Sequence, residues 1–172
     1  MANIRSNVDY PSGFKFYANL IGTGTPMFAG KLVSNVLVSS GDALYATAGY
    51  LTPTATTDVH VAGVAVTRQA TSVTVNVSML FYPAADWVVF SGQTSGTMTQ
   101  AKIWTLMDIE GTRGIQEINE NATSNQNVLA IGFEPNTSIG AQSRVLFTWA
   151  KSKFTGKAVE PDYSIFSSGY AV

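Results

Sequence analysis

The chain has 172 residues, no cysteine, a formal net charge of −1 and only 12% charged residues. A chain of this length forms one domain that buries roughly two-thirds of its unfolded surface without disulfides. The absence of cysteine excludes disulfides and thiolate zinc sites, and a pI of about 5.7 argues against a nucleic-acid-binding protein. With no secretion signal and no run of roughly 18 apolar residues, we expect no export and no membrane insertion.

The first element in chain order is an N-terminal arm, residues 1–30, that is rich in aromatic residues but has no clean periodicity. Its aromatic residues are Tyr10, Phe14, Phe16, Tyr17 and Phe28. A C-terminal arm, residues 153–172, has the same character and carries Phe154, Tyr163, Phe166 and Tyr170. Removing the large apolar area of aromatic side chains from water is favourable, so we predict that each arm is held by the domain itself or by a neighbouring subunit.

The β domain between the arms, residues 31–152, contains a series of predicted strands. The clearest is at 72–82, where apolar residues occupy every second position from Val73 to Phe81, as in a half-buried antiparallel strand. A strand at 58–67 precedes it and forms a hairpin through residues 68–71. Further strands are predicted at 32–38, 43–48, 87–90, 127–133 and 144–150. A short helix or turn is predicted near 99–104, followed by a strand, and residues 111–127 are predicted as loop and turn.

These elements predict an all-β fold: a compact antiparallel β-barrel or β-sandwich with one short helix and extended N- and C-terminal arms. Gly41 and Asp42 are predicted to form a turn that leads into the strand at 43–48. The Thr- and Pro-rich stretch after that strand is predicted to be a surface loop. Gly63 is predicted to allow close packing or a bulge within a core strand.

No residue pattern indicates catalysis, and we expect no enzyme activity, no cofactor and no metal. His60 is the only histidine, and no G-x-S-x-G turn accompanies it. We interpret His60 as a strand residue that faces solvent or an interface, with a pH-sensitive contact as the alternative. The acidic residues between positions 108 and 120 are interpreted as part of a solvated loop, with a cation site as the alternative. These residues are Asp108, Glu110, Glu117 and Glu120.

Charge is scarcest in the middle of the chain. From position 32 to position 101 the charged residues are Asp42, Asp58, Arg68 and Asp86. A surface with so few charges limits the solubility of a free monomer. We therefore expect much of this surface to contact another protein.

The order of segments resembles that of the small capsid decoration proteins, also called head stabilisation or cement proteins, of tailed bacteriophages. The opening YPSGFKFYANLIGTGTP is followed by GDAL, VAGVAV, PAADWVVF, TMTQAKIW and VLAIGFEP. The similarity covers roughly residues 10–155. It implies a compact β domain that assembles as a homotrimer, binds the major capsid protein where capsomers meet, and reaches over the shell with its N-terminal arm.

The resemblance implies a protein of the outer capsid surface of the virion, present in the host cytoplasm during assembly. It implies that the arm aromatics contact the capsid or a neighbouring subunit. The alternative function is a receptor- or carbohydrate-binding β module of a virion fibre or adhesin, in which Trp87, Trp104 or Trp149 stacks on a sugar. The third class of function is an enzyme, which is disfavoured because the sequence shows no nucleophile paired with a general base.

Overall fold

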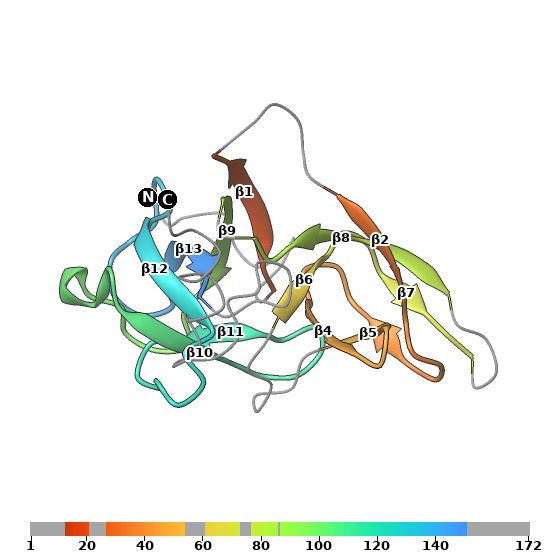
Figure 1. Ribbon diagram of the computed structural model, residues 1–172. Coiled ribbons are helices and arrows are strands. Elements are labelled where there is room, and N and C mark those ends of the chain that lie inside the picture. The colour runs from red at the N-terminus through yellow and green to blue at the C-terminus, as the bar shows by residue number, and fades with distance from the viewer. Residues whose placement is uncertain (1–12, 21–26, 54–60, 73–76, 86, 151–172) are drawn as a thin grey trace, which may run out of the picture.

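The computed structural model of the chain describes residues 13–20, 27–53, 61–72, 77–85 and 87–150 (Figure 1). Within these residues the regular structure consists of β-strands and one short 3-10 turn, η1 (Gln100–Lys102). All strand pairs within the sheets are antiparallel. The predicted all-β fold is confirmed, as is the short turn near 99–104.

The larger sheet of the described chain has six strands and occupies the left half of Figure 1. Its strands, in spatial order, are β1 (Lys15–Asn19), β9 (Val88–Gln93), β13 (Arg144–Trp149), β12 (Val128–Phe133), β10 (Leu106–Glu110) and β11 (Glu117–Asn119). The sheet curls, because a parallel bridge joins Ile118 of its last strand to Thr94 at the end of β9. The Ser95 N–H donates to the Ile118 carbonyl at 2.9 Å and adds a second link between these two segments.

The second sheet has five strands and lies in the right half of Figure 1. In spatial order these are β2 (Phe28–Lys31), β8 (Ser78–Pro83), β6 (Val61–Ala65), β4 (Ala43–Thr47) and β5 (Tyr50–Pro53). It curls in the same way, through a parallel bridge between Leu32 and Leu51. A small two-stranded sheet joins β3 (Leu37–Val38) to β7 (Gln69–Ala70).

Each curled sheet encloses its own hydrophobic core, and β6 lies between the two cores. All five residues of β6 are buried. Val61 and Val64 belong to the core of the six-stranded sheet, whereas Ala62 and Ala65 belong to the core of the five-stranded sheet. Successive strand residues point to opposite faces, and the register shift that leaves Ala62 unpaired displaces this alternation by one residue, so that Val61 and Val64 share a face. A strand between two cores must be apolar on both faces, which explains the run VAGVAV.

Two of the predicted turn and packing residues have geometries that favour glycine. Gly41 has a φ of +84° and accepts a hydrogen bond on its carbonyl from the Phe14 N–H at 2.8 Å. A Cβ at Gly63 would overlap both the Tyr82 carbonyl oxygen and the Phe81 ring. The pairing of β4 with β6 shifts register next to Gly63, between Leu44 and Tyr45. Gly63 therefore lies at a point of close strand approach beside a bulge.

Most of the predicted strands are present, but four predictions about chain segments are wrong. The predicted strand at 32–38 is interrupted at Asn35, whose φ is +57°, so only β3 remains of its second half. The predicted loop at 111–127 contains β11. The first residues of the predicted Thr-, Ala- and Pro-rich loop belong to β5, and its residues from 54 onward lie outside the described part of the chain. The connection at 68–71 is not a simple hairpin loop, since it contains β7.

The described part of the predicted N-terminal arm is not an arm. Residues 15–19 and 28–31 form β1 and β2, which are edge strands of the two sheets. Backbone pairing with β9 and β8 therefore holds this segment on the domain, one of the two possibilities that its aromatic content left open.

Candidate protein-contact surface

The arm aromatics predicted to contact a partner fall into two groups. Tyr10, Phe154, Tyr163, Phe166 and Tyr170, together with His60, lie outside the described residues. The structure places the remaining four, which are Phe14, Phe16, Tyr17 and Phe28.

Phe14 belongs to the core, so its predicted role in a protein contact is wrong. Its side chain is 2% exposed. The ring packs edge-on against Phe147, with centroids 5.4 Å apart, and against Trp149 at 5.5 Å. Edge-to-face contacts of this kind add to the free energy of burial, so Phe14 stabilises the domain rather than binding a partner.

Phe16 joins the two sheets on the surface side of this core. Its ring stacks on Tyr82 of β8, with centroids 4.9 Å apart and planes 23° apart. Both rings are half-buried and pack against the edge of the first core. β1 of one sheet is thereby held beside β8 of the other.

An apolar strip continues from Tyr82 along the same face of β8. Leu80 lies two residues before Tyr82, so the two side chains share a face, and Leu80 is 45% exposed. Ala29 of the edge strand β2 lies opposite Leu80 and is also exposed. We call the group of Phe16, Ala29, Leu80 and Tyr82 the apolar seam.

Further exposed apolar side chains lie on β1 and β2 or next to them in the chain. Phe28 is 44% exposed on β2, but it pairs with the buried Phe81, 6.3 Å away between ring centroids, and so faces the side of the sheet opposite to Ala29 and Leu80. Tyr17 is the extra residue where the pairing of β1 with β9 shifts register, and it is 43% exposed. A β-bulge redirects a side chain, which here turns Tyr17 toward solvent. Leu20 and Met27 are exposed as well.

The strands that carry the apolar seam have few charges. Among the residues of β1, β2 and β8 only Lys15 and Lys31 are charged, and both are exposed. A surface of aromatic and aliphatic side chains with charges only at its margin has the composition of the buried centre of a protein interface.

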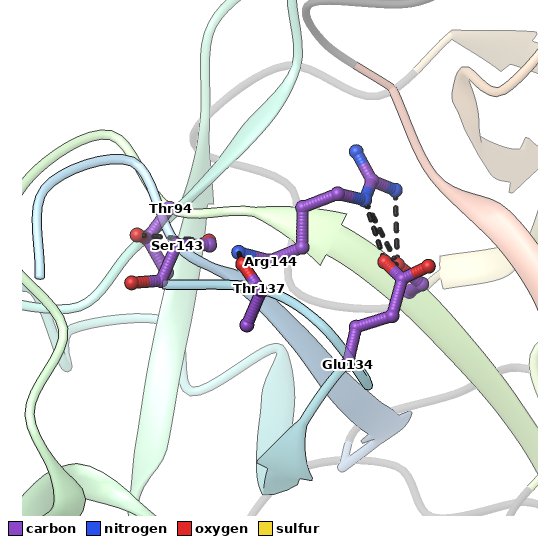
Figure 2. Close-up of polar contacts among 6 residues, drawn as sticks. Thr94, Glu134, Thr137, Ser143 and Arg144 are labelled. Atoms are coloured by element: carbon purple, nitrogen blue, oxygen red, sulfur yellow. Dashed lines mark hydrogen bonds and ion pairs between the residues drawn. The ribbon is translucent and has the colours of Figure 1, made fainter. Parts of the chain in front are cut away.

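A polar cluster lies at Ser91, and Figure 2 shows its members Glu134 and Arg144. The Ser91 hydroxyl donates to a Glu134 carboxylate oxygen at 2.5 Å, and Arg144 Nε donates to the same oxygen at 2.7 Å. Arg144 also donates to the Ser91 oxygen from Nη2 at 2.9 Å. The guanidinium neutralises the carboxylate that a serine nucleophile would need as its base, so the geometry is that of a clamp between β9 and β13.

Backbone contacts extend this clamp to the loop at 134–143. The Arg144 N–H donates to Thr137 Oγ1 at 3.0 Å, and Thr94 Oγ1 donates to the Ser143 carbonyl at 3.2 Å (Figure 2). These bonds fix the middle and the C-terminal end of the loop to the sheet.

The predicted solvated acidic loop is wrong, because protein donors take up its carboxylates. Asp108 is 5% exposed and accepts hydrogen bonds from the backbone N–H groups of Ser124, Asn125 and Gln126. Glu120 is also 5% exposed and accepts the Gly96 N–H at 3.1 Å. The described residues contain no group of three or more His, Asp or Glu side chains that could hold a metal ion.

Asp42 has a larger structural role than a turn residue. Its carboxylate is buried and accepts the N–H groups of Ser39 and Gly114, each at 2.7 Å. Burial raises the pKa of Asp42, an effect that these two hydrogen bonds and the charge of Arg113 oppose. The nearby Gln116 side chain, which sequence analysis missed, accepts the Ala43 N–H at 2.6 Å.

Sequence analysis also missed Leu80, although the sequence contained a signal for it. In the alternating run at 72–82, Leu80 stands on the face that carries Ser78 and Tyr82, where a polar residue is expected. An apolar residue on the solvent face of a strand marks a position to examine for a larger exposed apolar patch.

The comparisons with known proteins identify no relative. The chain matches no protein-family profile, no curated protein and no solved structure. In the part of the chain that the structure describes, no helix has the length and apolar character needed to cross a membrane.

Proposed function

We propose that this protein is a capsid decoration protein of a tailed bacteriophage. It binds the outer surface of the assembled, expanded head and stabilises it through contacts with the major capsid protein and with neighbouring copies in a homotrimer. The observation that carries the proposal is the apolar seam, which spans both sheets through the half-buried Phe16 and Tyr82 and exposes Ala29 and Leu80. The order of sequence segments from 10 to 155 supports the same function.

Such a protein acts by binding to other proteins. A protein that binds only the assembled shell lowers the free energy of that shell by mass action. Many copies bind one particle, so modest interfaces act together. Leu80 and Ala29 supply apolar area that the partner removes from water, and the marginal lysines orient the approach.

The test is co-sedimentation of the purified protein with unexpanded and expanded shells stripped of accessory proteins. We expect saturable binding to expanded shells alone and a higher melting temperature of those shells. Absence of binding to either form of shell contradicts the proposal.

A pair of variants locates the contact on the apolar seam. Leu80→Glu should weaken shell binding at least tenfold, because burial of a leucine side chain contributes about 1.5–3 kcal/mol and about 1.4 kcal/mol corresponds to a factor of ten. Ile139→Glu is the matched control, since Ile139 is 59% exposed but lies in the loop at 134–143. Equal binding by the two variants would show that the apolar seam is not the contact.

A further inference from the structure

Trp104 is the most exposed large apolar side chain among the described residues. Its exposed fraction is 70%, whereas Trp149 is fully buried and Trp87 packs against the first core. Trp104 lies between η1, which ends at Lys102, and β10, which begins at Leu106. No other exposed large apolar residue of the described chain lies on η1, β10, β11 or β12.

The backbone of Trp104 is held in an unfavourable conformation. Its φ is +67°, in the left-handed region that is unfavourable for L-amino acids other than glycine. Specific contacts keep it there: the Trp104 N–H donates to the Ala130 carbonyl at 2.8 Å, and Thr105 Oγ1 donates to the Lys102 carbonyl at 2.7 Å. Strain and exposure at one bulky residue both oppose stability, which is the pattern of a residue retained for binding.

The residues around Trp104 indicate the class of ligand. Gln100 and Thr105 are exposed on the same turn, and Lys102 Nζ donates to Asn121 Oδ1 at 2.6 Å across to the next loop. A single indole among amide, hydroxyl and ammonium groups differs from the apolar seam, where several apolar side chains adjoin. Pyranose sugars present an apolar C–H face together with hydroxyl groups, and this combination matches such a surface.

We propose that the turn at 100–105 is a carbohydrate-binding site in which a pyranose ring stacks on Trp104. Lys102, Thr105 and Asn121 supply hydrogen bonds to its hydroxyl groups. The site shares no strand with the apolar seam and does not depend on the capsid proposal. It supplies a second binding activity on one domain.

The test titrates the full chain with methyl β-D-glucopyranoside, methyl β-D-galactopyranoside, N-acetylglucosamine and the trisaccharides of each, with tryptophan fluorescence as the readout. We expect a saturable change with at least one sugar. Trp104→Gly should abolish that change and leave Tm equal or higher, by up to about 2–4 °C, because glycine adopts a positive φ without strain.

Two matched variants complete the experiment. Trp87→Phe should keep the sugar affinity, and Lys102→Ala combined with Asn121→Ala should weaken it at least tenfold while the indole remains. Absence of a response in the natural chain overturns the proposal, as does a response that survives in Trp104→Gly. Loss of shell binding in Trp104→Gly without any sugar response would assign Trp104 to a protein contact and would also overturn it.

Discussion

The two cores of this domain differ in the size of the side chains that they bury. The core of the six-stranded sheet encloses four large aromatic residues, which are Phe14, Phe90, Phe147 and Trp149. The core of the five-stranded sheet relies on aliphatic residues and on Phe81. Each aromatic ring removes about 150–250 Å² from water, so the first core contributes more to stability per residue.

The surfaces of the two sheets differ in the opposite sense. Three strands of the five-stranded sheet each carry a large apolar residue that is at least a third exposed, namely Phe28, Tyr50 and Leu80. The four inner strands of the six-stranded sheet carry none in the described chain. The exposed apolar residues of the six-stranded half lie on its edge strand β1 or in loops, as Tyr17 and Trp104 do, whereas the five-stranded sheet presents Leu80 on an inner strand. Stability and binding are therefore separable by mutation.

The largest effect is expected from the aromatic core. Phe147 contacts Phe14, Phe90 and Trp149, so Phe147→Ala removes the ring at the centre of this cluster. We expect a loss of about 3–5 kcal/mol in the free energy of unfolding, measured by urea denaturation. Phe28→Ala, at a half-exposed ring, should lose less than about 1.5 kcal/mol. Similar losses in the two variants would contradict the assignment of stability to the first core.

A substitution in β6 should damage both cores together. Gly63→Ala places a methyl group against the Tyr82 carbonyl, which is backbone and cannot rotate away. We expect a loss of about 1–3 kcal/mol or more from overpacking. Gly132→Ala is the matched control, because a Cβ there meets nothing within 4 Å, and it should be neutral or slightly stabilising. Equal thermal stability of the two variants would show that β6 has room to move.

The same contrast explains which strands could be predicted from the sequence. β8, β9, β12 and β13 alternate or run apolar over several residues because each lines a core. β1, β2 and β11 are edge strands with at most one fully buried side chain each, and distant partners rather than local pattern select their extended form. A sequence read locally carries no signal for such pairing.

The candidate site residues could likewise be predicted only in part from the sequence. Aromatic content alone could not distinguish Phe14, which is buried, from Tyr17, which a bulge turns outward. The three tryptophans were equivalent in the sequence, and only the packing separates Trp104 from Trp149. Side-chain exposure depends on register, and a shift of one residue reverses it.

A smaller effect is expected at Asp42, which links the two halves. Its carboxylate holds Gly114 of the loop before β11, and its carbonyl accepts the Ala65 N–H at the end of β6. Because the pKa of Asp42 in the folded protein is raised above 3.8, the folded state binds its proton more tightly than the unfolded state. This stabilisation is complete below that pH and is lost as pH rises through the raised pKa.

The measurement compares the natural chain with Asp42→Asn by urea denaturation from pH 3.5 to 7. Relative to the variant, the natural chain should lose stability as pH rises, with a slope of at most about 1.4 kcal/mol per pH unit. Glu117, whose pKa burial also raises, is present in both proteins and cancels in the difference. Parallel pH profiles would mean that Asp42 binds its proton equally in both states.

The smallest effect is expected in the hairpin between β4 and β5, at the periphery of the second core. Its two turn residues, Ala48 and Gly49, both have positive φ, +48° and +82°, as a type I′ turn requires. Asparagine tolerates this conformation better than alanine, so Ala48→Asn should stabilise the protein by up to about 1 kcal/mol. Gly49→Ala should cost about 1–2 kcal/mol for purely conformational reasons, since a Cβ there meets no atom. If the second core is the less stable half, Ala48→Asn will slow amide exchange in β5 and leave exchange in β13 unchanged, because local opening of the hairpin does not involve the aromatic core.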